Sequence, residues 1–209
     1  KLDFAGEFYT HTRMIPAFDP GPNPFGPPRI FTAGFGPLST RVAGEVSDGF
    51  IVHPVNTRRS LQELTLPAIA EGAESTERSV DDIEVVCVTT IVTGRDEQEF
   101  ERSLAGVRGQ LAFYATTPAY LPVFELHGYG DLHPVLNRMA KENRWDEMPA
   151  LIDDELVETI AVVGEPHEIA AKIQARLAGI SDHVSLVNNR APDPGHFAEI
   201  VDGLKSPAS

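Results

Sequence analysis

The residues with the clearest chemical potential form a glycine-rich turn, Ala33-Gly34-Phe35-Gly36. The turn follows an apolar run typical of a buried strand and precedes Pro37, a residue that suits the first position of a helix. Glycines let backbone N–H groups approach an anion, and a helix N-terminus carries roughly half a positive charge. The turn therefore predicts a phosphate-binding loop, although a plain strand-to-helix connection would use the same glycines.

A dinucleotide-binding site is disfavoured by the residues around this turn. The spacing approaches the G-x-G-x-x-G fingerprint, but Ser39 stands at the third glycine position. Such sites also carry an acidic residue about 20 residues further on, where this chain has His53 and Pro54 instead. A phosphate bound at the turn would belong to another kind of ligand.

The second candidate for chemistry is His53, which follows the apolar run at residues 49–52. Active sites of parallel α/β sheets lie at the carboxyl ends of the strands, so we expect this side chain on the functional rim. An imidazole with an unperturbed pKa of about 6.5 could donate to a substrate carbonyl or phosphate, or transfer a proton as a catalytic residue. The alternative is a structural histidine bonded to a backbone carbonyl.

The remaining histidine and cysteine residues do not predict a metal site. His127 and His133 flank the sequence GYGDL, which is not the i, i+4 spacing of a helical ligand pair, and no third ligand is evident. The one cysteine, Cys87, lies in an apolar run and suits a buried thiol in the cytosol rather than a disulfide. We expect no metal.

The overall charge argues against two kinds of partner. The 209 residues carry a net charge of −14, whereas nucleic acids and anionic membranes are bound by basic surfaces. No apolar run is long enough to span a bilayer, and the first ten residues lack the apolar core of a signal peptide. We therefore expect a cytoplasmic protein that acts on a small-molecule substrate.

Four apolar runs are expected to be the strands that position these residues, at 30–33, 49–52, 83–92 and 184–187. Helical patterns separate the runs, and a long region beyond the third run is mostly helical. The short run IAVV, which ends at Val163, fits either a minor strand or an extended loop. Strands that alternate with helices predict an α/β fold with a parallel sheet.

Two of the helices show an apolar face in the sequence. After the glycine turn, Leu38, Val42 and Val46 recur at i, i+4 and i+8, with Ala43 beside them, which predicts one apolar face of a short helix. A late helix repeats isoleucine and leucine at the same spacing and should end at Gly179.

Three stretches of the chain resemble the luciferase-like oxidoreductases. They are FAGEFYT, PPRIFTAGFGPLSTRVAGEVSDGFIVH and VVGEPHEIAAKI, and the first two surround a proline-rich segment. The likeness is closest to the branch that uses the deazaflavin coenzyme F420 in place of FMN. The resemblance implies a (β/α)8 TIM barrel of which the four runs are strands five to eight.

The resemblance also implies how the chain is organised. It implies a single domain, 1–209, that is the C-terminal half of the barrel. Residues 1–29 would be an extended proline-rich lead-in, 30–95 three barrel strands with their helices, 96–160 a helical insertion, and 161–209 the last helix-strand-helix unit. Because a complete barrel typically needs about 250 residues, we expect an N-terminal portion to be missing from this sequence.

The resemblance implies hydride transfer between coenzyme F420 and an unknown small organic substrate, in a full-length homodimer. Backbone groups of Ala33, Gly34, Phe35 and Gly36 would contact the phosphate-bearing tail of the cofactor, and His53 would lie on the substrate side. The 209-residue chain alone would be inactive. Two alternatives are an FMN-dependent monooxygenase on the same fold and a non-catalytic half-barrel that binds a ligand or serves in assembly.

Overall fold

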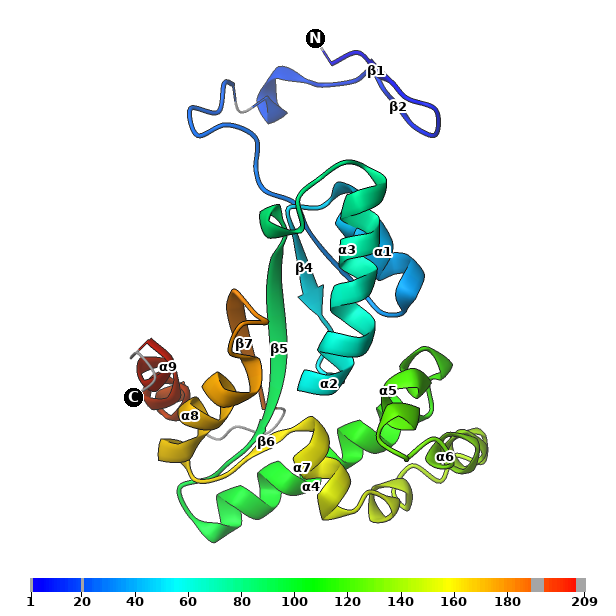
Figure 1. Ribbon diagram of the computed structural model, residues 1–209, viewed down its shortest axis with the longest axis vertical. Helices are drawn as coiled ribbons and strands as arrows, with labels where there is room; N and C mark the ends of the chain where they lie inside the picture. The colour runs from blue at the N-terminus through cyan, green and yellow to red at the C-terminus, as the bar shows by residue number, and fades with distance from the viewer. Residues whose placement is uncertain (1, 20, 189–193, 206–209) are drawn as a thin grey trace.

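The computed structural model describes residues 2–19, 21–188 and 194–205 (Figure 1). Its strands are β1 (Phe4–Ala5), β2 (Thr10–His11), β3 (Phe31–Gly34), β4 (Gly49–Val52), β5 (Glu84–Val92), β6 (Val162–Val163) and β7 (His183–Val187). Its α-helices are α1 (Pro37–Val46), α2 (Arg58–Ser60), α3 (Leu66–Ser75), α4 (Glu97–Ala115), α5 (Leu121–Leu126), α6 (Leu132–Lys141), α7 (Asp154–Ile160), α8 (Pro166–Leu177) and α9 (Pro194–Lys205). None of the described helices is both long and apolar enough to cross a membrane.

The central sheet is parallel and is built around β5. Strand β4 pairs with β3 on one side and with β5 on the other, β7 pairs with β5, and β6 pairs with the last two residues of β5. The described strands do not close into a barrel. The expected α/β fold with a parallel sheet is confirmed. Because Gly34 of β3 pairs with Val52 of β4, the carboxyl ends of these two strands lie at the same rim of the sheet.

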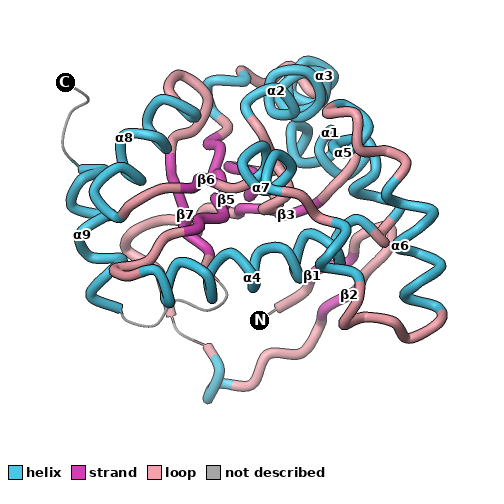
Figure 2. Tube along the Cα trace, turned by 90° about the horizontal axis from the view of Figure 1, so that it is seen from below, coloured by secondary structure: helices cyan, strands magenta, loops and turns pink. Residues whose placement is uncertain are grey.

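A first apolar core lies between the sheet and the helices on its outer side. Phe50 and Val52 of β4 and Cys87 of β5 contribute to it from the sheet, and Ile69 and Ile173 contribute from α3 and α8. Figure 2 shows the strands in the middle of the molecule, with α8 and α9 on one side, α1 to α3 on another and α4 across a third. Helices therefore cover the sheet on its outer side, as a parallel sheet requires.

A second apolar core lies beyond the carboxyl ends of β4 and β5. It joins Val55 and Val92, just past or at the strand ends, to Leu111 of α4, Phe124 of α5 and Leu156 of α7. The helices between residues 97 and 160 therefore pack onto the rim of the sheet rather than onto its outer face.

The expected apolar face of α1 is wrong for its three large residues and right only for Ala43. Leu38, Val42 and Val46 are exposed to 74%, 42% and 68%, while Ala43 and Gly44 are buried. The reason is the close approach of α1 to α3, because a Cβ added to Gly44 would lie 2.2 Å from the carbonyl oxygen of Ile69. Small residues set this helix contact, and the larger apolar side chains point away from it.

The other sequence expectations about these elements agree better with the structure. Each of the four expected strands is present with its ends shifted by no more than one residue. Helix α8 buries Ile169, Ile173 and Leu177, and Gly179 follows it with a φ of 71°. Of the ambiguous run IAVV, only Val162–Val163 forms a strand.

The segment before the sheet is extended, but it is not featureless. It contains the antiparallel pair β1–β2 and a short 3-10 turn at Pro16–Phe18. Its aromatic side chains are strongly exposed, with Phe8 at 82% and Phe25 at 94%. Figure 1 shows this segment extending away from the sheet and helices.

Candidate functional site

The glycine turn joins β3 to α1, and its two glycines are needed for different reasons. Gly36 has a φ of 88°, a left-handed conformation that disfavours residues with a side chain. A Cβ on Gly36 would meet no atom within 4 Å, so the space in front of it is open. A Cβ on Gly34 would instead lie 2.8 Å from the Ser39 hydroxyl oxygen.

Two side chains of α1 hold the turn in place. The Ser39 hydroxyl donates to the carbonyl oxygen of Phe35 at 2.8 Å, and the Thr40 hydroxyl donates to that of Gly36 at 2.8 Å. These two carbonyl oxygens of the turn therefore accept hydrogen bonds from side chains of α1. The N–H groups of the first helical turn, which have no partner inside a helix, remain directed outward beyond its N-terminus.

His53 lies beside this turn on the neighbouring strand. Because Gly34 pairs with Val52, the next residues, Phe35 and His53, follow side by side, and their ring centroids are 5.6 Å apart at an edge-to-face angle. The backbone N–H of Val55 donates to His53 Nδ1 at 3.2 Å. The structure thus brings together the two features that the sequence singled out, at one rim of the sheet.

Two tyrosines from the helical region complete a ring cluster around His53. Tyr120 stacks on the imidazole at 4.4 Å between centroids and 25° between planes, and Tyr114 meets it edge-on at 4.9 Å. This burial lowers the pKa of His53 below its ordinary value. Burial therefore favours the neutral form of this imidazole.

A cavity of about 390 Å³ adjoins the turn and His53. It lies between the glycine turn, the π-helical turn at Leu61–Thr65 that leads into α3, and the start of α5. Most of its lining is apolar, and its ionisable carboxylates are those of Glu63 and Glu71. No lysine or arginine lines it in the part of the chain that the structure describes.

The two other histidines that the sequence singles out are hydrogen-bonded inside the structure, and the cysteine is buried. His127 Nε2 is 2.9 Å from the hydroxyl of Thr57, His133 Nδ1 is 2.8 Å from the carbonyl oxygen of Ala115, and Cys87 is fully buried. Burial raises the pKa of the Cys87 thiol. Within residues 2–19, 21–188 and 194–205, no three histidine, cysteine or acidic side chains gather in a way that could hold a metal ion.

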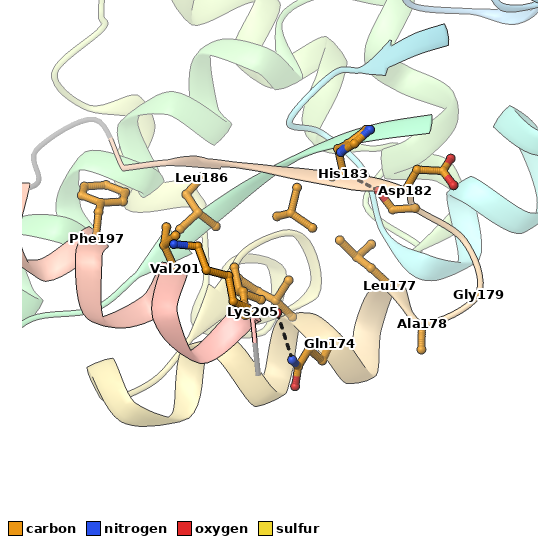
Figure 3. A pocket seen from close by; sticks show the side chains of 14 residues that line it. Gln174, Leu177, Ala178, Gly179, Asp182, His183, Leu186, Phe197, Val201 and Lys205 are labelled. Carbon is orange, nitrogen blue, oxygen red and sulfur yellow. Dashed lines mark hydrogen bonds between the residues drawn. The ribbon is translucent and has the colours of Figure 1, made fainter. Parts of the chain in front are cut away.

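A second hollow, of about 890 Å³, lies elsewhere, between β7, α8 and α9 (Figure 3). Apolar side chains such as Leu177, Leu186, Phe197 and Val201 line it, with Asp182 and His183 at the start of β7. Since these two residues mark the amino end of their strand, the hollow is opposite the rim where parallel sheets carry chemistry. It is not the candidate site.

Sequence reasoning missed the ring cluster. The glycine turn predicts a backbone role for Phe35 and no contact through its ring, and Tyr114 and Tyr120 lie in a region for which the sequence predicts only helix. No periodicity connects these tyrosines to His53, because they reach it only through the packing of α4 and the turn at Pro118–Tyr120.

The model of one protein family, described as luciferase-like monooxygenase, matches residues 1–183. The chain belongs to the luciferase-like monooxygenase family. Uncharacterized proteins of Mycobacterium tuberculosis and Mycobacterium bovis are 44% identical to it over 184 residues, which is 88% of this chain and 54% of theirs. The 5,10-methylenetetrahydromethanopterin reductase of Methanopyrus kandleri is 26% identical, over 79% of this chain and 46% of the enzyme.

F420-dependent enzymes are also among the relatives of this luciferase-like chain. An F420-dependent glucose-6-phosphate dehydrogenase of Intrasporangium calvum is 28% identical over 98% of this chain and 56% of the enzyme. The chain therefore spans about half the length of the curated relatives it matches.

Solved structures agree with the fold of this luciferase-like chain. The coenzyme F420-dependent tetrahydromethanopterin reductase of Methanopyrus kandleri has a TM-score of 0.65 at 23% identity, over 84% of this chain and 49% of that one. The EDTA monooxygenase of Chelativorans has a TM-score of 0.61 at 14% identity, over 97% and 48%. At these identities the likeness shows the fold alone.

Proposed function

We propose that this chain is the C-terminal half of a luciferase-like (β/α)8 barrel. We propose that the full-length protein is an oxidoreductase that transfers hydride between coenzyme F420 and a small organic substrate. The 209-residue chain alone would lack activity. The observation that carries the proposal is the glycine turn beside His53, on one rim of a parallel sheet, in a chain of this family.

The half-barrel is supported by the pairing of the strands. Strands β3, β4, β5 and β7 are parallel neighbours, as four successive strands of a barrel would be, and α1, α3 and α8 pack on their outer side. Strand β3 pairs only with β4, and β7 only with β5, within the described residues. Two unpaired edges suit a sheet that continues into four more strands.

Coenzyme F420 is supported by the local chemistry of the turn and by the names of several relatives. The open space before Gly36, together with the outward N–H groups of α1, would let a phosphate group approach the backbone. Ala33 through Gly36 would hold the tail phosphate through their backbone. When bound, the coenzyme would supply a two-electron hydride carrier that reacts poorly with oxygen.

An FMN-dependent monooxygenase is the second candidate. It is favoured by structural neighbours that are named monooxygenases, among them the EDTA monooxygenase and the long-chain alkane monooxygenase, with TM-scores of 0.61 and 0.53. The identity of the cofactor would determine the reaction. With F420 the protein would exchange a hydride with its substrate, and with FMN it would activate oxygen.

A titration of the full-length protein tests the choice of cofactor. We expect oxidised coenzyme F420 to bind, seen as a change in its fluorescence, and FMN to bind at least about tenfold more weakly, a difference of about 1.4 kcal/mol. Tighter binding of FMN, or a flavin absorbance spectrum in the purified protein, would overturn the assignment in favour of the monooxygenase.

A further inference from the structure

We propose that His53 is a pH-sensitive switch, because its neutral ring holds the buried loop of residues 53–57 in place and its protonated ring cannot. The loop joins β4 to α2 and forms part of the wall of the cavity beside the glycine turn. This inference goes beyond the proposed function, since it does not depend on which cofactor or substrate the full-length protein uses. Three features support it: the direction of one hydrogen bond, the burial of the loop, and the groups that face the imidazole.

The loop is buried but has no regular structure, so each of its N–H groups needs an acceptor of its own. Val55, Asn56 and Thr57 are only 1%, 4% and 5% exposed. The N–H groups of Asn56 and Thr57 donate to oxygen atoms of nearby residues, at 2.9 and 2.8 Å. The N–H of Val55 donates to His53 Nδ1 at 3.2 Å and has no other acceptor within the described residues. The imidazole therefore takes the place of a backbone acceptor.

Protonation of His53 breaks this hydrogen bond, because a backbone N–H can only donate. In the neutral ring the lone pair of Nδ1 accepts from Val55. In the imidazolium both ring nitrogens carry a hydrogen and neither can accept. The Val55 N–H would then face a second N–H, and a buried donor would be left without a partner. A histidine bonded to a backbone carbonyl, the alternative that the sequence leaves open, would keep its hydrogen bond on protonation.

Three other histidine hydrogen bonds in the structure survive protonation. His127 Nε2 is 2.9 Å from the hydroxyl of Thr57, which can either donate or accept. His133 Nδ1 is 2.8 Å from a backbone carbonyl oxygen, which accepts from the neutral and the charged ring alike. His183 Nε2 is 2.9 Å from a carboxylate oxygen, which binds an imidazolium more strongly. Among these four histidines, His53 is the one whose hydrogen bond is lost in acid.

The rings that face His53 do not stabilise its charged form through an ion pair. Phe35 from the glycine turn, Tyr114 from α4 and Tyr120 from the following turn pack against the imidazole. A tyrosine ordinarily loses its proton only near pH 10, and burial raises the pKa of Tyr114 further. None of these side chains therefore carries a negative charge in the pH range where a histidine titrates.

The carboxylates of the adjoining cavity are paired with arginines. Glu63 lies 2.8 Å from Arg59 and Glu71 lies 3.7 Å from Arg41, so their negative charges are balanced locally. Burial accordingly lowers the pKa of His53 below its ordinary value of about 6.5. The hydrogen bond to Val55 is therefore fully present above that ordinary value, and it is lost as the pH falls through the lowered one.

The loop connects this switch to the sheet and to the helical region. Near its start, Asn56 Nδ2 donates to the carbonyl oxygens of His53 at 2.7 Å and of Val88 in β5 at 2.8 Å. At its end, the hydroxyl of Thr57 is bonded to His127, the residue that follows α5. The segment between these contacts lines the cavity. Its release in acid would loosen the cavity wall and the contact between α5 and the rim of the sheet.

Hydrogen exchange of the Val55 amide in the full-length protein tests the switch without any cofactor. The protection factor corrects for the pH dependence of exchange itself. We expect it to fall about five- to tenfold from pH 7.5 to pH 5.5, because a released histidine with a pKa of about 6.5 takes up a proton in this range. The amides of β5 should keep their protection, and a return to pH 7.5 should restore that of Val55. Constant protection at Val55, an equal loss throughout β5, or a loss that is not reversed would overturn the proposal.

Two substitutions of His53 separate the acceptor from its titration. His53→Asn offers an amide oxygen near the position of Nδ1 and has no proton to gain between pH 5 and 8. The Val55 amide of this variant should be protected at pH 7.5 and equally protected at pH 5.5. His53→Leu offers no acceptor, so the amide should be weakly protected at both pH values. The proposal fails if the protection of Val55 still falls with pH in His53→Asn.

The same substitution at a second histidine is the matched control. His133 also forms a hydrogen bond through Nδ1, but to a carbonyl oxygen, so its protonation should not affect the loop. His133→Asn should therefore keep the native pH dependence of Val55 protection. If His133→Asn abolished that dependence as His53→Asn does, the effect would not come from the ring of His53, and the proposal would be refuted.

Discussion

At the scale of single residues, Gly36 shows what the turn requires. Its φ of 88° is costly for any residue with a side chain, and the open space before it is where a ligand phosphate could approach the backbone. Gly34 is constrained differently, by the nearby Ser39 hydroxyl. Glycine is therefore fixed at both positions, but only Gly36 faces the space that a ligand would occupy.

Gly36→Val should weaken binding of F420 to the full-length protein by about tenfold or more, or about 1.4 kcal/mol. The added side chain would fill the approach to the backbone, while β3 and α1 persist. A fluorescence titration measures the affinity. Gly179→Val is the matched control, because it brings similar backbone strain, at a φ of 71°, to the far end of α8. Native affinity in the Gly36 variant would contradict a phosphate site at the turn.

The sequence was sufficient to locate the turn and His53 because each sits at the end of a recognisable strand. It was not sufficient for Tyr114 and Tyr120, since their contact with His53 depends on how α4 packs over the rim. The hydrogen bond from the Val55 N–H to His53 Nδ1 could not be predicted either, because it forms within a loop that has no sequence signature.

At the scale of elements, the contact between α1 and α3 is a backbone contact. A Cβ on Gly44 would lie 2.2 Å from the Ile69 carbonyl oxygen, and one on Gly72 would lie 2.0 Å from that of Arg41. Helical periodicity predicted the wrong face of α1 because it counts large apolar residues, whereas this pair of helices is packed through glycine. The same reasoning was right for α8, whose isoleucines and leucine do fill the core.

Gly44→Ala and Gly109→Ala should change stability in opposite directions, although both place the same methyl group in a helix. At Gly44 the methyl group forces α1 and α3 apart, and we expect a loss of roughly 1–3 kcal/mol. At Gly109 a Cβ would meet nothing within 4 Å, so the better helix propensity of alanine should add about 0.5–1 kcal/mol. Urea unfolding of the full-length protein measures both, and a stabilised Gly44 variant would contradict the close packing.

At the scale of the whole molecule, the sheet has two strand edges that are unpaired within the described residues. Strands β3 and β7 each pair on one side only within the described residues, and the segment before β3 exposes Phe8, Phe18 and Phe25 to more than 70%. Open strand edges and exposed aromatic rings favour association with other chains. The short apolar runs, which alternate with helical patterns, were sufficient to predict the strands and their parallel pairing. They were not sufficient to predict whether the sheet closes into a barrel.

We expect the 209-residue chain alone to be marginally stable or to associate, and the full-length protein to be stable. Light scattering gives the mass in solution, and calorimetry shows whether melting is a single cooperative transition. A monomeric 209-residue chain with a sharp transition at high temperature would contradict the half-barrel proposal.

The central place of β5 has a consequence for how the protein is made. One edge of β5 can pair with β4 as soon as both strands are made, but the other edge cannot pair with β7 until β7 has been made. The backbone N–H of Val85 donates a hydrogen bond to the side chain of Asp182, which lies 97 positions further along the chain. At typical synthesis rates of 5–20 residues per second, that edge stays unpaired for roughly 5–20 s after it leaves the ribosome. The residues of the second core all precede β7 in the chain, so during this interval that core can already fold over the end of β5. The helices that cover the candidate site would then also protect the strand at the centre of the sheet.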